Sequence, residues 1–373
     1  MGFTFPVTKY PRVLIMSRKN AQVMGHKYFF WYLLQNIKAL PPDVMSPEVG
    51  KRNGELQKVI LGVVSCGGRY EEAMTMLRSA VLFSGGMSLH VVAIVDDETR
   101  QNFTDAITSL FEEALGASSF FTYEIKSTWF PPKNAGIWKK LYAPCSAQRI
   151  FFPSLLPKVD ALLYVDSDTV FVSELRGIWN HFSKMDQTQW VGVTNEDEPT
   201  GDGWYNTKAE IPYFKPRGLN TGVLLLNLTR MRFYEAEQKA EKVLRLYGDK
   251  LYWGDQDIFN VMFSWNPEFV YILPCEYNFR PSHCFCRYNG SCSCGSAALQ
   301  GVRIIHGNLQ AFRKKGFFQS IYKAFQKQSL SQEKLSELNE ELQKRYNNFW
   351  NSSDHKCVGS SHHFFKQLIS WSS

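Results

Sequence analysis

Apolar runs and helical spacings alternate in the first half of the chain. Residues 59–64 and 89–95 are almost continuously apolar, which is typical of strands buried on both faces of a sheet. Between them, residues 71–83 carry apolar side chains at helical spacing. This order predicts a β-α-β unit, and therefore a parallel sheet with a right-handed crossover.

Similar apolar runs later in the chain extend the predicted sheet, with helices between several of them. We expect further strands at residues 161–165, 190–193, 222–228, 269–273 and 302–305. The predicted fold class is α/β, with a Rossmann-like, mixed and mostly parallel sheet flanked by helices.

The two ends differ from this middle part. Residues 1–57 have the features of a loosely ordered, stem-like lead-in that ends in turn-rich sequence, and the main domain is predicted at residues 58–320. Residues 321–373 are predicted to form a C-terminal helical extension, whose apolar stripe favours core packing over a partner site. The stripe consists of Leu335, Leu338, Leu342, Tyr346 and Phe349.

Composition indicates a globular protein and argues against nucleic-acid binding. Of 373 residues, 44% are hydrophobic and 21% charged, enough to bury a full core. The net charge of +7 is spread along the chain except at Arg313, Lys314 and Lys315, so a concentrated basic face is not expected. No segment approaches the ~20 apolar residues that cross a bilayer, and the first residues lack the order of a signal peptide. As written, the sequence predicts a soluble chain.

The cysteines indicate an oxidising compartment. Five of the eight lie in one short stretch: Cys275, Cys284, Cys286, Cys292 and Cys294. A disulfide-stapled loop of a secretory-pathway protein is the simplest interpretation. Zinc is the alternative, but spacers of one residue are shorter than those of most structural zinc sites. Glycosylation sequons occur at Asn102, Asn289 and Asn351; a fourth, at Asn227, lies inside an apolar strand and is not expected to be modified.

Two aspartates follow the apolar run at 161–165. Asp166 and Asp168 stand where the chain leaves the carboxyl end of a buried strand, the edge at which α/β sheets bind ligands. Two carboxylates leave positions open on an octahedral Mg²⁺ or Mn²⁺ for the diphosphate of a nucleotide. The motif therefore suggests a nucleotide-sugar site. The alternative is a solvated turn, because Asp favours turns and hydrogen-bonds its own backbone.

A histidine after the last apolar run is a candidate third ligand. His306 follows residues 302–305, and such a histidine on its own is usually structural. A metal ion held by two carboxylates requires further ligands. An imidazole among them shifts the preference from Mg²⁺ toward Mn²⁺.

A second polar cluster precedes a helix that we expect to begin at Ile258. One of Asp255, Gln256 and Asp257 would then cap that helix. The functional alternative is that Gln256 or Asp255 points at a reacting anomeric carbon, where an oxygen stabilises developing positive charge.

Two further positions have both a structural and a ligand-binding interpretation. In residues 218–222, Asn220 can hydrogen-bond sugar hydroxyls and Gly222 lets backbone approach a ligand, although such a turn needs no ligand. Arg149, on a helix upstream of the aspartates, pairs with phosphate or sugar hydroxyls, or else forms a surface salt bridge.

Taken in order, these segments resemble a retaining glycosyltransferase of the GT-A fold, in the family that includes glycogenin and bacterial lipopolysaccharide galactosyltransferases. Within it, the resemblance is strongest to the glucoside xylosyltransferases. The segments that carry it are 63–67, 138–142, 144–149, 163–168, 203–206, 220–222, 227–232, 253–257, 277–281 and 306–308. The resemblance makes residues 58–320 a GT-A catalytic domain.

The resemblance also implies roles for particular residues. Asp166, Asp168 and His306 would hold Mn²⁺, with Mg²⁺ as the second choice. Gln256, with Asp255, would sit beside the anomeric carbon. The remaining substrate-binding residues implied are Val64 and Ser65 near the uridine; Arg149, Asp166, Ser167, Asn220, Thr221, Gly222 and Gly307 at the donor; and Trp204 and Tyr205, with Trp138, as aromatic candidates for the acceptor glucose.

The implied reaction transfers xylose from UDP-xylose to the 3-hydroxyl of glucose that is O-linked to EGF-like repeats, such as those of Notch, in an α-1,3 linkage. Retention would use same-face attack, with the leaving diphosphate accepting the acceptor's proton. The resemblance implies the lumen of the Golgi or endoplasmic reticulum and a type II membrane anchor, which this sequence lacks. The family's lysine six residues after the histidine is also absent: Phe312 stands there, and Arg313 or Lys314 would contact phosphate.

Three alternatives remain open from the sequence. The same chemistry can use another UDP-sugar, as a glucosyl- or galactosyltransferase does, and a non-catalytic relative can bind sugar with the same fold. A sugar-nucleotide pyrophosphorylase requires a basic, glycine-rich loop after the first strand, whereas residues 65–70 contain only Arg69 as a basic residue.

Overall fold

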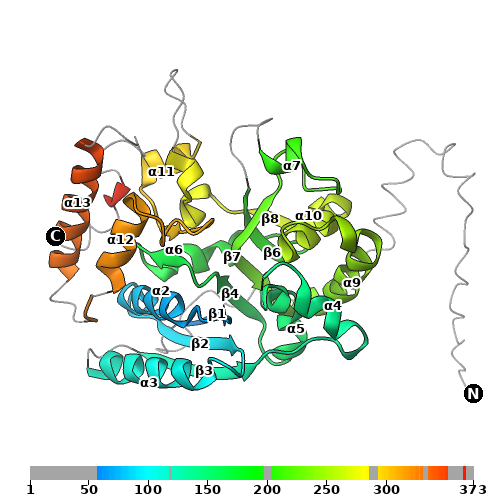
Figure 1. Cartoon of the computed structure of the whole chain (residues 1–373), viewed down its shortest axis with the longest axis horizontal. Coiled ribbons are helices and arrows are strands. Elements are labelled where there is room, and N and C mark those ends of the chain that lie inside the picture. The colour runs from blue at the N-terminus through cyan, green and yellow to red at the C-terminus, as the bar shows by residue number, and fades with distance from the viewer. Residues whose placement is uncertain are drawn as a thin grey trace, which may run out of the picture. The chain divides into compact units, whose positions relative to one another are not determined.

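A mixed seven-stranded sheet forms the centre of the protein in the computed structural model (Figure 1). The structure describes residues 57–116, 120–143, 145–196, 203–284, 293–326, 328–330, 335–351 and 364–366. The predicted lead-in at 1–57 therefore lies outside the described residues, apart from its last residue.

The strand order of the sheet is β3-β2-β1-β4-β7-β6-β8. The strands are β1 (Lys58–Ser65), β2 (Ser88–Val95), β3 (Phe121–Ser127), β4 (Ala161–Val165), β6 (Val191–Asn195), β7 (Leu219–Asn227) and β8 (Val270–Ile272). Only β7 runs antiparallel to its neighbours β4 and β6, and the other pairs are parallel. The α/β prediction with a mixed, mostly parallel sheet is confirmed.

Most predicted strands are found within a few residues of their expected bounds, but the last one belongs to a different sheet. Residues 302–305 overlap β9 (Ile304–His306), which pairs antiparallel with β5 (Thr169–Phe171) in a separate two-stranded sheet. The sequence analysis did not predict β3 or β5. β5 follows β4 after a turn of three residues, so the chain passes from the large sheet to the small one at Asp166–Asp168.

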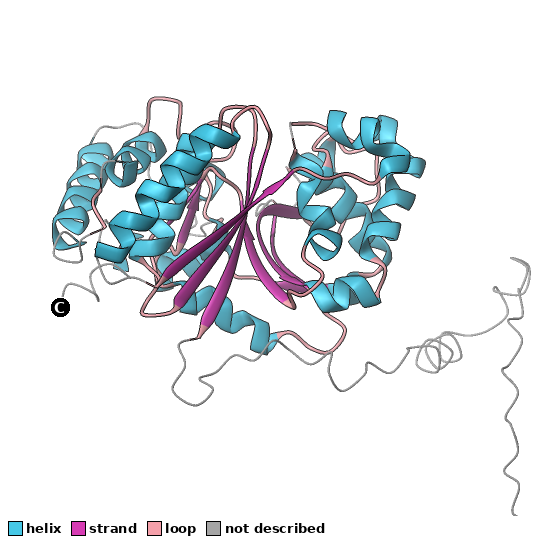
Figure 2. Cartoon of the chain, turned by 90° about the horizontal axis from the view of Figure 1, so that it is seen from below, coloured by secondary structure: helices cyan, strands magenta, loops and turns pink. Residues whose placement is uncertain are grey.

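Helices cover both faces of the sheet, as Figure 2 shows. The α-helices are α2 (Tyr70–Leu82), α3 (Arg100–Gly116), α4 (Ala135–Lys140), α5 (Phe152–Leu155), α6 (Leu175–Trp179), α7 (Trp204–Thr207), α8 (Leu228–Phe233), α9 (Ala236–Tyr247), α10 (Asp255–Trp265), α11 (Gly295–Gln300), α12 (Phe317–Gln326) and α13 (Leu335–Asn351). Short 3₁₀ turns are η3 (Pro132–Asn134), η4 (Ser146–Phe151), η5 (Asn180–Lys184), η6 (Gly248–Lys250), η7 (Pro267–Phe269), η8 (Cys275–Asn278) and η9 (Pro281–Cys284).

The two faces of the sheet contribute to two apolar clusters because side chains alternate along each strand. In β4, Leu163 joins a cluster with α2, α3, α12 and α13, while Leu162 and Tyr164 join a second cluster with α9 and α10. Both faces of β4 are buried, which explains why its sequence is a continuous apolar run.

The C-terminal stripe packs against the core, as predicted. Leu338, Leu342 and Tyr346 on α13 are at most 2% exposed and belong to the same apolar cluster as β1. The side chains of Leu335 and Phe349 lie outside the described residues. The expected boundary between 320 and 321 falls within α12. Among the described residues, no helix combines the length and apolar character that a membrane span requires.

Among the described residues, the disulfides Cys275–Cys294 and Cys66–Cys145 tie loops to this framework. Cys275–Cys294 closes the cysteine-rich stretch. The prediction of a disulfide-stapled loop is therefore confirmed in preference to a zinc site. Cys66–Cys145 joins the loop after β1 to the turn before η4, a pairing that the sequence analysis did not predict. Asn227 is 2% exposed and its side chain caps α8, in agreement with the expectation that its sequon is not used.

Candidate active site

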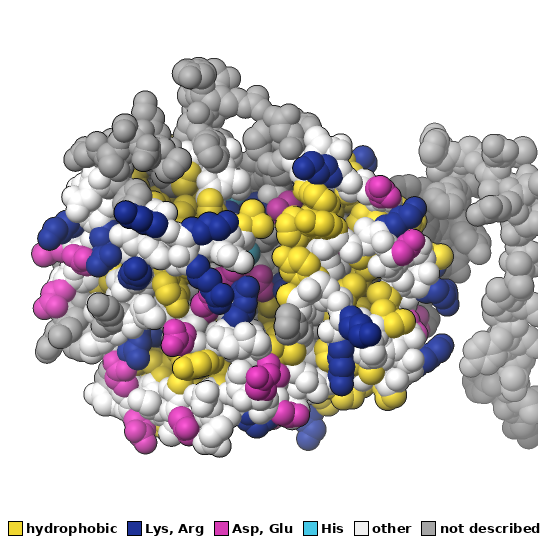
Figure 3. All heavy atoms as spheres, viewed as in Figure 1, with side chains coloured by type: hydrophobic (Ala, Val, Ile, Leu, Met, Phe, Trp, Pro, Cys, Tyr) yellow, Lys and Arg dark blue, Asp and Glu magenta, His cyan; other side chains and the backbone are white. Residues whose placement is uncertain are grey.

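A pocket of about 560 Å³ opens at one edge of the sheet. The carboxyl ends of β1 and β4 and the start of the antiparallel β7 meet there, so side chains from distant parts of the sequence share its walls. Figure 3 shows acidic side chains and a histidine in a central hollow, with Lys and Arg side chains on one side and hydrophobic ones on the other.

The register of the small sheet brings three candidate metal ligands together. His306 pairs directly with Thr169, the residue after Asp168, and the backbone N–H of Gly307 donates to the Asp168 carbonyl at 2.7 Å. Nε2 of His306 lies 3.5 Å from Oδ1 of Asp168 and 3.7 Å from Oδ2 of Asp166. One ligand atom from each residue lies within 4.8 Å of the others.

The imidazole of His306 is oriented by a buried amide. Nδ1 lies 2.8 Å from Oδ1 of Asn278, which is itself 0% exposed. The Asn278 amide donates to Thr194 at 2.9 Å and to Asn220 at 2.8 Å, so its oxygen must face the histidine. Nδ1–H of His306 therefore donates to Asn278, and Nε2 is the ring nitrogen that faces the two aspartates.

Gly222 permits the close approach of this histidine. A Cβ at residue 222 would lie 2.2 Å from Cε1 of the His306 ring, far inside van der Waals contact. Its carbonyl also accepts from the backbone N–H of Asp166 at 2.8 Å. Gly222 is not among the residues that line the pocket, so the structure gives it a packing contact with His306 where the resemblance implied a sugar contact.

Arg149 links the metal-ligand cluster to α10. It is 7% exposed, and its guanidinium lies 3.0 Å from Oδ1 of Asp166 and 2.7 Å from Oδ2 of Asp255. The third nitrogen donates to the Thr221 carbonyl at 2.6 Å, and the guanidinium stacks over the Tyr164 ring. The alternative of a surface salt bridge is wrong, because the whole side chain is buried.

Burial and neighbouring charges shift the pKa values of this cluster. Burial opposes the charge on Arg149, but Asp166 and Asp255 outweigh it and raise its pKa. Burial raises the pKa of Asp255 to about 7, with Arg149 opposing the shift. Burial also works against ionised Asp168, yet His306 and Arg69 outweigh it and its pKa is lowered. Asp168 is therefore a carboxylate, as a metal ligand must be.

Gln256 and Asn220 are held against a carboxylate that the sequence analysis missed. Oε2 of Glu196 accepts from Asn220 at 2.6 Å, from Arg280 at 2.8 Å and from Gln256 at 3.4 Å. The carbonyl oxygen of Gln256 accepts from the Thr221 backbone N–H at 3.2 Å. Glu196 directly follows β6, just as Asp166 follows β4, and that position was the available sequence signal.

The expected start of the helix at Ile258 is wrong. The helix α10 begins at Asp255, and the N-cap is Gly254, which has no side chain to act as a cap. Asp257 instead accepts from the backbone N–H groups of Tyr252 and Trp253, both at 2.7 Å. Asp257 therefore ties the segment that enters α10 to the first turn of the helix.

Most of the other expected substrate-binding residues line the pocket, and some do not. Val64, Ser167 and Thr221 line it, whereas Ser65 is 0% exposed and Gly307 contributes the backbone contact to Asp168. The aromatic candidates for the acceptor are outside its walls. Trp138 and Tyr205 are both 2% exposed, and Trp204 lines a neighbouring hollow. The Tyr205 hydroxyl donates to Asp257 at 2.7 Å, so it supports α10 from within the core.

Basic side chains also form part of the pocket wall. Arg69 and Lys314 both line it, and the Arg69 guanidinium lies 3.7 Å from Asp168. Arg313 turns away, since its guanidinium is paired with Glu72 at 2.7 Å. Phe312 is 3% exposed and packs in the core, so it leaves no room for a cation at that position.

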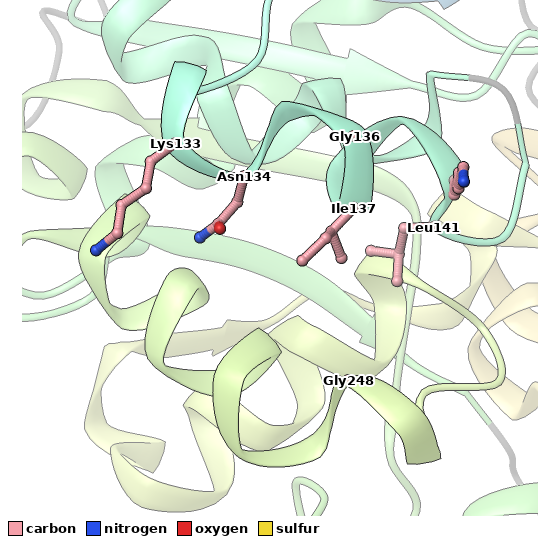
Figure 4. A pocket seen from close by; sticks show the side chains of 7 residues that line it. Lys133, Asn134, Gly136, Ile137, Leu141 and Gly248 are labelled. Carbon is pink, nitrogen blue, oxygen red and sulfur yellow. The ribbon is translucent and has the colours of Figure 1, made fainter.

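A separate hollow of about 440 Å³ lies between α4 and η6 (Figure 4). It is lined by Lys133, Asn134, Gly136, Ile137, Lys140, Leu141 and Gly248. Its lining lacks carboxylates and histidines and shares no residue with the pocket above the aspartates. The candidate active site is therefore the acidic pocket.

Comparison with known proteins agrees with this geometry. Residues 72–311 match the sequence family described as Glycosyl transferase family 8. The chain belongs to glycosyl transferase family 8. The family 8 chain is 36% identical to Glucoside xylosyltransferase 1 of Mus musculus over 332 residues, which cover 84% of this chain and 77% of the mouse protein. It is 35% identical to Glucoside xylosyltransferase 2 of Xenopus laevis over 322 residues, which cover 83% of this chain and 71% of the Xenopus protein.

Solved structures share the fold of this family 8 chain. The galactosyltransferase LgtC, solved in complex with donor and acceptor sugar analogs, has a TM-score of 0.51 and 17% identity, covering 66% of this chain and 86% of LgtC. The bifunctional glycosyltransferase WbbM has a TM-score of 0.55 and 14% identity, and the match covers 78% of this chain and 52% of WbbM. The predicted GT-A fold and glycosyltransferase activity are confirmed at the level of the family.

Proposed function

We propose that this chain is a metal-dependent, retaining xylosyltransferase. It transfers xylose from UDP-xylose to the 3-hydroxyl of O-linked glucose on EGF-like repeats of Notch-type glycoproteins and forms an α-1,3 linkage. The names of the relatives support the choice of sugar and acceptor glucoside. The observation that carries the chemistry is the convergence of Asp166, Asp168 and His306 at the pocket.

The three side chains fit Mn²⁺, with Mg²⁺ as the second choice. Ligands that occupy adjacent positions of an octahedral ion at about 2.1 Å are roughly 3 Å apart. The Nε2–oxygen separations of 3.5 and 3.7 Å are therefore close to what such an ion requires. Oδ1 of Asp166 is already bonded to Tyr164 at 2.6 Å and Arg149, which leaves Oδ2 for the ion. When bound, the ion would neutralise charge on the departing diphosphate.

The residues of α10 and η4 would bind the donor sugar. Arg149 and Asp255 lie 2.7 Å apart and both line the pocket, so sugar hydroxyls can exchange hydrogen bonds with both. Asn220 lies on the same wall. These groups would fix the orientation of the sugar ring before the reaction, which lowers the entropic part of the barrier.

The position of Gln256 favours retention without a covalent intermediate. Its amide is held by Thr221 and Glu196, so its carbonyl oxygen can stabilise positive charge at the anomeric carbon but is a poor nucleophile. The bond from the anomeric carbon to the diphosphate breaks as the bond to the acceptor oxygen forms on the same face. The acceptor's proton passes to the leaving diphosphate.

Arg69 and Lys314 would bind the diphosphate in place of the missing family lysine. Both line the pocket, whereas Arg313 is engaged with Glu72. The charge of a guanidinium suits phosphate oxygens in particular. Of the two cations suggested by the sequence at 313 and 314, we therefore favour Lys314.

We also propose residence in the lumen of the Golgi or endoplasmic reticulum. The Cys66–Cys145 and Cys275–Cys294 disulfides support an oxidising compartment, because such bonds do not persist in the reducing cytosol.

Transfer to a defined acceptor tests the function. The purified chain would be incubated with Mn²⁺, UDP-xylose and an O-glucosylated EGF-like repeat, and the product read by mass spectrometry. We expect the repeat to gain one pentose residue, the bare repeat to gain none, and EDTA to stop the reaction. Asp168→Asn should abolish transfer, whereas Asp97→Asn, at a carboxylate that is 92% exposed, is the matched control.

The same assay separates the remaining alternatives. Faster transfer from UDP-glucose or UDP-galactose would show that the donor assignment is wrong. Binding of UDP-xylose without turnover, unaffected by Asp168→Asn, would favour a non-catalytic sugar-binding relative.

A further inference from the structure

Four aromatic side chains form a continuous patch beside the acidic pocket. Tyr142 and Trp253 meet edge to face with ring centroids 5.7 Å apart, and Trp253 contacts Tyr252 at 4.8 Å. Trp204 completes the patch, with its ring 4.4 Å from that of Tyr252 and 5.6 Å from that of Trp253. We call these four residues the aromatic platform.

The platform is unusual because its tyrosines are exposed. Tyr142 is 59% exposed and Tyr252 is 58% exposed, so the rest of the described chain leaves both rings largely uncovered. Large aromatic side chains that lie together on a surface commonly mark a binding site. The patch is therefore a surface available to a partner molecule.

The platform is continuous with the proposed reaction centre. Tyr142 and Trp253 line the same pocket as Asp255 and Gln256, and Trp253 stands only three residues before Gln256. A ring bound on this side of the pocket would reach the anomeric carbon of a donor sugar held by Arg149 and Asp255. The basic wall with Arg69 is assigned to the diphosphate, so the platform is on the acceptor side.

The backbone beneath the platform keeps the rings in place. Gly254 has a φ of 62°, and a Cβ there would lie 2.5 Å from Cβ of Tyr142, so only glycine lets the two segments pack this closely. Asp257 accepts from the backbone N–H groups of both Tyr252 and Trp253. The rings are thus presented by a backbone that is fixed before any ligand binds, which limits the entropy lost on binding.

We propose that the aromatic platform binds the acceptor sugar, a hexopyranose ring attached to protein, by stacking against its C–H face. This inference rests on the proposed function and names the acceptor site of the same pocket. The C–H groups of a pyranose carry partial positive charge and are attracted to the negative face of an aromatic ring.

The surroundings of the platform favour a sugar over an apolar peptide. Beyond Tyr252 the surface enters a hollow of about 290 Å³ whose lining alternates apolar and charged groups, including Lys208, Glu210 and Asp249. On the pocket side, Glu196 and Gln256 offer hydrogen-bonding groups. Aromatic faces bordered by hydrogen-bonding side chains match a polyol, which has apolar faces and a polar edge.

Binding to a complex that cannot react tests the proposal independently of turnover. The chain, saturated with UDP and Mn²⁺, would be titrated by calorimetry with an O-glucosylated EGF-like repeat and with the same repeat lacking glucose. Tyr142→Ala and Tyr252→Ala should each weaken binding of the glucosylated repeat about tenfold. The loss in Kd for the glucosylated repeat should exceed any change in Kd for the bare repeat or for UDP.

Matched variants separate stacking from other effects. Phe120→Ala removes an aromatic ring that is 59% exposed on another part of the surface, and it should bind both repeats as the wild type does. Tyr142→Phe should retain most of the affinity, because stacking needs the ring and not the hydroxyl. Since both tyrosines are exposed, the alanine variants are expected to fold, and their melting temperatures check this.

The outcomes distinguish this inference from the proposed function. Equal losses for the glucosylated and bare repeats would place polypeptide, not sugar, on the platform and overturn the proposal, as would wild-type affinity in both alanine variants. Selective loss of glucoside binding in a chain that transfers no xylose would support the platform and reject the proposed donor chemistry.

Discussion

Nδ1 of His306 lies 2.8 Å from the amide oxygen of Asn278, and this buried contact determines which imidazole nitrogen faces the aspartates. Asn278→Ala should therefore lower Mn²⁺ affinity by about 10- to 100-fold, the usual effect of losing a residue that orients a metal ligand. Titration calorimetry of Mn²⁺ in the presence of UDP measures the change.

Asn278→Asp is the informative companion to that variant. It keeps an oxygen for His306 but cannot donate to Thr194 and Asn220, so it should recover part of the lost affinity. Equal Mn²⁺ affinity in the wild type and Asn278→Ala would mean that His306 is not a ligand or does not depend on this contact.

The disulfides Cys66–Cys145 and Cys275–Cys294 should differ in their contribution to stability. Cys66–Cys145 spans 79 residues and Cys275–Cys294 spans 19, and a longer closed loop restricts the unfolded chain more. By loop-closure entropy, removal of the first by paired alanine substitutions should cost about 4.5 kcal/mol and removal of the second about 3 kcal/mol. Denaturant unfolding of both double variants measures this, and an inverted order would contradict the loop-entropy account.

Loss of Cys66–Cys145 should also weaken UDP binding, which is a separate test of its position. Cys66 and Ser146 line the pocket, and the disulfide joins the segments that contain them. The Cys275–Cys294 double variant, whose cysteines are not among the lining residues, is the control. If both double variants bind UDP as the wild type does, the bond stabilises the fold alone.

A buried histidine remote from the pocket should make stability depend on pH. Burial, with help from Lys184 and Arg303, lowers the pKa of His181 to about 4. In the unfolded chain the pKa returns to about 6.5. Between these values the unfolded state binds more protons, so unfolding free energy falls as pH decreases from about 6.5 to 4.

His181→Gln removes this titration and can still hydrogen-bond Tyr271, the partner of His181 at 2.8 Å. The wild type should lose more in melting temperature than the variant when pH is lowered from 7.5 to 5. Parallel losses in both proteins would assign the pH dependence to other groups.

The sequence predicted the parts of the fold that arise from local patterns. β4 was found at its predicted bounds because both its faces are buried and its sequence is therefore a continuous apolar run. β3 was missed because it is an edge strand with half of its side chains facing solvent. β5 was missed because three residues are too few for a periodic pattern.

The site residues also differ in whether a local sequence pattern reveals them. Asp166 and Asp168 are separated by a single residue, so a local motif reveals them. The distance to His306 depends instead on the pairing of β5 with β9, a register that local pattern does not specify. Asn278 reaches the site from a short 3₁₀ turn with no periodic pattern. Sequence alone could not separate the buried Tyr205 from the exposed Tyr142, because burial depends on tertiary packing.

The basic wall of the pocket provides the last prediction, in which each phosphate of the nucleotide is tested separately. Arg69→Met and Lys314→Met should each weaken UDP binding about fivefold, a modest factor because both side chains are partly solvated and screened. Uridine affinity should not change, since uridine has no phosphate, and UMP should show a smaller loss than UDP. Lys315→Met, which removes a neighbouring exposed cation outside the pocket lining, is the matched control.

Because the two cations act on phosphate directly, the loss of UDP affinity should persist in EDTA. A loss seen only with Mn²⁺ present would mean that they act through the metal cluster. An equal loss for uridine would mean that the substitutions distort the pocket.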